Sequence, residues 1–113
     1  MTSNLATLSE YKTDIDYSIS SDYSSVIEKQ ENYSYKIGNV VTLSLSLKFT
    51  GSITSYTPFC TITPAPKQIT YCVMQSVSDG TTIPAFIESN GSIKSRFSKT
   101  LSGFYGISAT YAI

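Results

Sequence analysis

The chain has 113 residues with eight basic and eight acidic side chains, and it contains neither histidine nor tryptophan. This length suits one domain, and the missing histidine excludes Ser-His-Asp and Cys-His catalysis together with the commonest metal ligand. Serine and threonine number 34, and nine tyrosines stand beside five phenylalanines, a composition typical of a β-rich protein with a hydroxylated surface.

The N-terminal part predicts one strand and much loop. Asn4 to Tyr11 has loosely helical spacing and is interpreted as a short helix or a lead-in segment. Ile15, Tyr17 and Ile19 alternate with polar residues, which is the period of a half-buried strand. The polar stretch from Ser20 to Glu31 is predicted to be mostly loop.

The strongest pattern of the sequence begins at Val41. Every odd position from Val41 to Phe49 is a large apolar residue and every even position between them is polar, which predicts a half-buried antiparallel strand. Residues 33–37 alternate in the same way, so Gly38-Asn39 is predicted to be the turn of a β-hairpin. Gly51-Ser52 is predicted to end the long strand.

The middle of the chain predicts two further strands. Residues 56–62 are strand-like, and Pro58 among them indicates a sheet edge or a bulge because proline cannot donate to the ladder. The connector Thr63-Pro64-Ala65-Pro66 is stiff. Residues 69–74 are apolar on both faces, which favours a central strand covered on both sides.

The last third predicts a hairpin and a C-terminal strand. Ser78-Asp79-Gly80 is a turn signal, and a strand follows from Ile83 to Glu88. Asn90-Gly91 predicts a type I′ hairpin whose second arm runs to about Phe97, and alternation from Phe104 to Ile113 predicts a final strand. About eight short strands at regular spacing favour an all-β antiparallel sandwich of jelly-roll type.

Two cysteines, Cys60 and Cys72, fall in strand-like segments on either side of the proline connector. If the two strands are neighbours, a disulfide is possible, and buried thiols are the alternative. The sequence starts without the basic and apolar stretches of a signal peptide, which favours synthesis in a cytosol, where thiols stay reduced. Buried thiols are therefore the preferred interpretation.

Binding chemistry is easier to find in this sequence than catalytic chemistry. A sugar site needs an aromatic plate beside a carboxylate, an amide or an arginine, and Tyr56, Asp79, Asn90 and Arg96 offer these groups near loops. Further aromatic groups are available at two other tyrosines, Tyr71 and Tyr105. Each of these residues also has a structural interpretation, and Asp79 is a turn former before it is a ligand.

The sequence gives little support for a metal site, for nucleic-acid binding or for membrane insertion. Asp14 and Asp16 supply too few oxygens for a calcium site, and no metal or cofactor is expected. The basic residues of the last two thirds are dispersed, which argues against nucleic acid as a partner: they are Lys36, Lys48, Lys67, Lys94, Arg96 and Lys99. No apolar run approaches the roughly 20 residues that span a bilayer, so membrane insertion is not expected.

Three segments carry a family resemblance. Tyr35-Lys36-Ile37-Gly38-Asn39-Val40-Val41-Thr42-Leu43 has the form aromatic-x-x-Gly-Asn-Val-Val, and Ile87-Glu88-Ser89-Asn90-Gly91-Ser92-Ile93 joins two isoleucines through a turn with glycine. The third segment is the closing run from Gly103 to Ile113. Together they resemble the C-terminal head, or tip, domain of tail-fibre and baseplate receptor-binding proteins of phages and prophages of low-GC Gram-positive bacteria. The chain departs from that pattern at residues 63–66 and in lacking tryptophan.

The resemblance implies a β-sandwich head, usually a homotrimer, that recognises a saccharide of the host cell surface without catalysis. Residues 31–113 would form the head, and residues 1–30 would be a lead-in or shaft join that includes the first strand. The location would be the virion, at the tail tip or baseplate beside other tail proteins, after assembly in the bacterial cytoplasm. One alternative is a structural virion module that trimerises or caps a fibre, and another is a glycan hydrolase using Asp or Glu.

Overall fold

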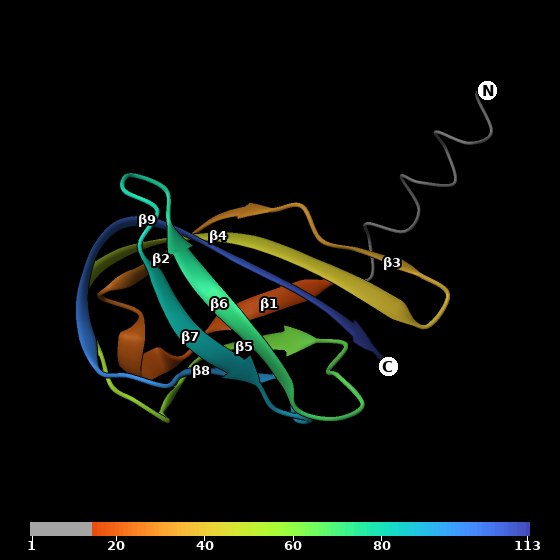
Figure 1. Cartoon of the computed structure of the whole chain (residues 1–113). Coiled ribbons are helices and arrows are strands. Elements are labelled where there is room, and N and C mark those ends of the chain that lie inside the picture. Colours follow the sequence, from red (N-terminus) through yellow and green to blue (C-terminus); the bar gives the residue numbers. More distant parts are fainter. Residues whose placement is uncertain (1–14) are drawn as a thin grey trace, which may run out of the picture.

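The computed structural model describes residues 15–113, which form an all-β antiparallel fold (Figure 1). The helix considered for Asn4–Tyr11 lies outside the described residues, as does Asp14. The strands are β1 (Asp16–Ile19), β2 (Ile27–Asn32), β3 (Tyr35–Ile37), β4 (Val40–Ile53), β5 (Pro58–Thr63), β6 (Thr70–Ser76), β7 (Thr82–Ile87), β8 (Ser92–Ser95) and β9 (Lys99–Ala112), with a 3-10 turn η2 (Ser21–Tyr23).

All strands belong to one sheet in the order β1-β5-β8-β7-β6-β9-β4-β2, with β3 pairing to β4 beside β2. Its two ends approach each other, because the Asn32 side-chain amide donates to the Ile15 carbonyl at 3.1 Å and the Lys29 ammonium lies 4.6 Å from the centroid of the Tyr17 ring. The sheet is therefore nearly closed, which confirms the predicted fold class in a form between a sandwich and a barrel.

The long alternating strand carries the centre of the core. Val41, Leu43, Leu45, Leu47 and Phe49 are all buried, as predicted, and the polar residues between them face outward. β4 pairs with β9 over all 14 residues, from Val40 opposite Ala112 to Ile53 opposite Lys99.

Three predicted boundaries were wrong. Residues 27–32 are strand rather than loop, and only Ile27 of β2 is buried, so the strand had no apolar alternation to reveal it. β4 continues past Gly51, where the absent side chain makes room for Val26, since a Cβ there would lie 2.7 Å from Val26 Cγ1. β9 begins at Lys99, five residues before the predicted start.

The Gly38-Asn39 hairpin is confirmed, with Ile37 opposite Val40 and Gly38 at φ +59°. Asn90-Gly91 also connects a hairpin, with Ile87 opposite Ile93. The type I′ assignment was wrong, because Gly91 has φ +90° but Asn90 does not share the positive φ that this turn needs. Pro58 does mark a bulge, since the register of β5 against β8 shifts between Pro58 and Cys60.

β6 is central in the sheet, as predicted, but the prediction that both its faces are covered was wrong. Ile69, Tyr71 and Val73 are 46%, 68% and 46% exposed. The reason is that the core lies on the inner side of the nearly closed sheet, so the outer row of β6 faces solvent.

The two cysteines are not on neighbouring strands, because β8 and β7 lie between β5 and β6. Both are free thiols; Cys60 is buried and Cys72 half-buried. Burial raises the pKa of Cys60 to about 12 and that of Cys72 to about 11, so both stay protonated at neutral pH.

Candidate functional site

An aromatic pocket lies on the outer face of the sheet where β6, β7 and β8 meet. Residues opposite each other in an antiparallel ladder point to the same face, and Tyr71 lies opposite Phe86. The Arg96 amide continues the ladder of β8 by donating to the Pro84 carbonyl at 3.0 Å. The resulting hollow of about 200 Å³ is lined by Tyr56, Ile69, Tyr71, Phe86 and Arg96, hereafter the aromatic pocket.

Phe86 forms the floor of the aromatic pocket. Its side chain is only 7% exposed although it points outward, because two tyrosines cover it. Its ring centroid lies 5.8 Å from that of Tyr56 and 6.4 Å from that of Tyr71, in tilted arrangements. The tyrosines are 57% and 68% exposed, so each keeps much of its ring available to a ligand.

Tyr56 reaches the aromatic pocket through an unusual backbone conformation. It is the one non-glycine residue within 15–113 that has a positive φ, +58°. Such a conformation costs about 1–3 kcal/mol for a residue with a side chain and is held by its surroundings. Here the Tyr56 amide donates to the Ser95 carbonyl at 2.8 Å, and the preceding Ser55 amide donates to Ser98 Oγ at 2.9 Å.

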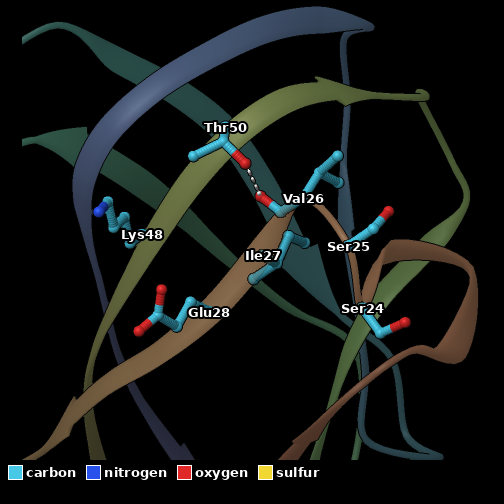
Figure 2. Close-up of a pocket in the computed structure, with 7 residues that line it drawn as sticks. All are labelled: Ser24, Ser25, Val26, Ile27, Glu28, Lys48 and Thr50. Atoms are coloured by element: carbon cyan, nitrogen blue, oxygen red, sulfur yellow. Dashed lines mark hydrogen bonds between the residues drawn. The ribbon is translucent and has the colours of Figure 1, made fainter.

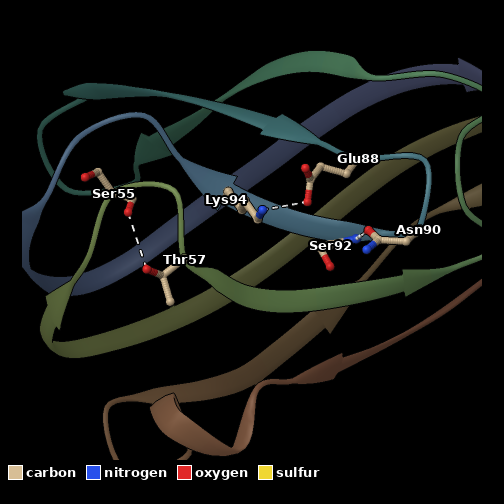
Figure 3. A network of polar contacts seen from close by, with 6 residues as sticks. All are labelled: Ser55, Thr57, Glu88, Asn90, Ser92 and Lys94. Atoms are coloured by element: carbon tan, nitrogen blue, oxygen red, sulfur yellow. Dashed lines mark hydrogen bonds and ion pairs between the residues drawn. The ribbon is translucent and has the colours of Figure 1, made fainter.

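Arg96 is the one charged residue that lines the aromatic pocket, and the two charged side chains nearby, Lys94 and Glu88, form an ion pair with each other. Lys94 lies opposite Phe86 in the register, and its ammonium lies 2.7 Å from Glu88 Oε1 (Figure 3). Each charge of that pair is therefore balanced beside the pocket. The Arg96 guanidinium supplies several donors in a planar fork that suits hydroxyl, carbonyl or acidic oxygens of a ligand.

Of the four residues predicted as a sugar site, the structure brings together Tyr56 and Arg96. Asp79 lies in the β6–β7 turn, where Oδ1 accepts from the Thr81 amide at 2.9 Å, and hydrogen bonds from Thr81 and Ser76 lower the pKa of its carboxyl. Asn90 lies at the opposite end of β7, and its Oδ1 accepts from the Ser92 amide at 3.0 Å (Figure 3). Both side chains stabilise their own turns, and neither lines the aromatic pocket.

The other two aromatic candidates differ from each other. Tyr71 lines the aromatic pocket, whereas Tyr105 is buried, with its ring edge-to-face on Phe49 at 5.4 Å between centroids. Sequence reasoning did not identify Ile69 and Phe86. A signal for Phe86 was present, because a hairpin folded about Ser78-Asp79-Gly80 places it opposite Tyr71.

A second, polar hollow of about 170 Å³ lies between the loop before β2 and β4 (Figure 2). Glu28 and Lys48 are register partners there, and the Thr50 amide donates to the Val26 carbonyl at 2.8 Å. Glu28 is the one carboxylate of this lining, and the aromatic pocket has none. Glycoside hydrolysis uses two carboxylates across one bond, an arrangement that these two hollows do not provide.

Within residues 15–113, no three His, Cys, Asp or Glu side chains are grouped so that they could hold a metal ion. The same residues include no helix that is long and apolar enough to cross a membrane. No protein-family model matches the chain, and no curated protein matches it significantly.

Proposed function

We propose that this protein is the receptor-binding head domain of a phage or prophage tail fibre or baseplate and that it binds a carbohydrate of the host cell surface during adsorption. The observation that carries the proposal is the aromatic pocket with Arg96 at its side. The resemblance of the two hairpins and of the closing strand supplies the phage context.

The chemistry of the aromatic pocket suits a sugar. A pyranose ring has an apolar face of C–H groups, which packs on the exposed rings of Tyr56 and Tyr71. Its hydroxyls accept hydrogen bonds from the Arg96 guanidinium, and they can donate hydrogen bonds to the tyrosine hydroxyls or accept them. The site is shallow, so a single sugar binds weakly, and several copies on one virion raise the total strength through avidity.

A homotrimer supplies that avidity in the proposal. The β3–β4 hairpin presents apolar side chains to solvent, with Tyr35 at 37%, Ile37 at 50% and Val40 at 46% exposed. Exposed apolar groups that lie together favour contact with another surface, and further copies of the chain or neighbouring tail proteins are the proposed partners.

The same hairpin favours a second candidate function. If its apolar residues are covered in a trimer and the aromatic pocket binds nothing, the protein is a structural virion module that trimerises or caps a fibre. The two functions differ in whether the aromatic pocket has a ligand.

Binding of the intact protein to an array of bacterial surface glycans tests the proposal. For the best glycan, Tyr71→Ala is expected to weaken binding by about three- to tenfold, the value of one aromatic contact. Tyr33→Ala is the matched control, because Tyr33 is 59% exposed but lies outside the aromatic pocket, and it should bind normally. Equal binding by both variants would reject the site.

Two other outcomes decide between functions. A stable oligomer that binds no glycan would favour the structural module. Release of reducing sugar from a bound polysaccharide would favour the hydrolase.

A further inference from the structure

A third hollow lies beside the aromatic pocket because two strands diverge. β6 pairs with β9 only from Val73 to Ser76, while β9 continues to Ala112 (Figure 1). Between the unpaired parts lies a hollow of about 300 Å³, hereafter the strand gap, lined by Lys67, Gln68, Ile69, Thr70, Thr110, Tyr111 and Ala112.

Two hydrogen bonds join the connector to β9 at the far end of the strand gap. The Lys67 amide donates to the Ala112 carbonyl at 2.8 Å, and the Tyr111 hydroxyl donates to the Pro64 carbonyl at 2.9 Å. These bonds tie the connector between β5 and β6 to the end of β9. The Ala112 carbonyl of β9 therefore accepts from the connector rather than from β6, which fixes the far end of the strand gap.

The strand gap and the aromatic pocket are adjacent, because Ile69 lines both. Ile69 is 46% exposed and is the one lining residue that the two hollows share. Together they make one groove over β7, β6 and β9, with Arg96 in the aromatic part and Lys67 in the strand gap. No carboxylate is among the residues that line either part.

We infer that this groove binds a linear saccharide of at least two sugar units, one on the aromatic pocket and the next in the strand gap. The inference rests on the proposed function. The first unit stacks on the tyrosines, and the second packs over Ile69 and hydrogen-bonds with Thr110, Gln68 and Lys67. The strand gap offers an ammonium, an amide and a hydroxyl, which are the groups that bind sugar oxygens.

The test is a length series on the intact protein. Mono-, di- and tetrasaccharide fragments of one bacterial wall polysaccharide, selected on the glycan array, are titrated in turn. The disaccharide is expected to bind at least about tenfold more tightly than the monosaccharide, with a smaller further gain for the tetrasaccharide.

Thr110→Val tests whether the tighter binding of the disaccharide comes from the strand gap, because valine keeps the shape of the side chain and removes its hydroxyl. We expect it to weaken the disaccharide about three- to tenfold and to leave the monosaccharide unchanged. Thr42→Val is the matched control, since Thr42 lies opposite Thr110 on the neighbouring strand and outside the groove. Its binding should match that of the unaltered protein.

The outcomes separate this inference from the proposed function. If mono- and disaccharide bind equally, or if Thr110→Val weakens both to the same degree, the second subsite is wrong and the sugar-binding function stands. If no fragment of any length binds, the proposed function itself fails.

Discussion

Tyr56 adopts an unfavourable backbone conformation that places its ring in the aromatic pocket. Its positive φ turns the chain so that the ring covers Phe86, and the cost is met by packing and by backbone hydrogen bonds. Backbone strain of this kind is concentrated at functional sites, where a side chain must be held in one position. The backbone and the ring of Tyr56 can be tested separately.

Tyr56→Gly and Tyr56→Ala both remove the ring, but only glycine is relaxed at this φ. The glycine variant is therefore expected to be about 1 kcal/mol more stable than the alanine variant in denaturant unfolding. Both variants should lose glycan binding to the same degree. An alanine variant as stable as the glycine variant would show that the conformation carries no strain.

Cys60 gives the folded state a dependence on alkaline pH. Burial raises its pKa from 9.0 to about 12, so the folded protein keeps a proton that the unfolded chain releases. The stabilisation is complete below pH 9 and is lost as the pH rises towards 12. Melting temperature should fall between pH 8 and 11, and by less in Cys60→Ala, whose melting temperature at pH 7 gives the baseline.

Among the elements, the β7–β8 hairpin is fixed from outside as well as by its own turn. The Ile62 amide of β5 donates to the Gly91 carbonyl at 2.9 Å, so this turn packs directly on a neighbouring strand. A side chain on Gly91 would collide with the Ile62 carbonyl oxygen, whereas one on Gly38 would meet open space. Both glycines have a positive φ, which makes them a matched pair.

Gly38→Ala is expected to cost about 1–2 kcal/mol of unfolding free energy, from the left-handed backbone alone. Gly91→Ala adds the collision, which is worth about 1–3 kcal/mol more. Chemical denaturation of the two variants measures the difference. Equal losses would mean that the hairpin moves away from β5 at little cost.

A clear period of two made β4 predictable, whereas β2, which has no apolar alternation, was missed. β4 and the second half of β9 alternate because one face of each lies on the core. β2 carries a row of exposed polar residues, and its pairing with β4 depends on contacts that a local pattern does not contain. Tyr56 and Arg96 were chosen from the sequence because their side chains suit sugar binding. That they line one pocket depends on how β6, β7 and β8 pair, which a local pattern does not contain.

At the scale of the whole molecule, β4 and β9 are the two longest strands with 14 residues each; β4 was predicted as a long strand that ends at Gly51, and β9 was predicted to be shorter than it is. The proposed trimer is supported by the exposed apolar residues of the β3–β4 hairpin. The two strands that begin before residue 31 pair within the same sheet as the rest, β1 with β5 and β2 with β4.

Light scattering at micromolar concentration should give three times the 12.3 kDa mass of the chain. Val40→Lys places a charge in the exposed hairpin and is expected to shift the population to monomer, because burying an unpaired charge is costly. Val77→Lys, at a site 70% exposed in the β6–β7 turn, should leave the mass unchanged. A monomer at every concentration would contradict the trimer.

The ladder between β4 and β9 also sets the order in which this protein can fold. Its partners are joined by all of β5 to β8, so the two longest strands meet only after a large loop has closed. Loop closure costs entropy before the ladder returns any energy, and proteins dominated by such distant pairings fold in about milliseconds to seconds. The hairpins β3–β4, β6–β7 and β7–β8 have short connections and can form first. The apolar row of β4 therefore stays open to other chains until β9 arrives, which makes this interval the time of greatest risk for aggregation.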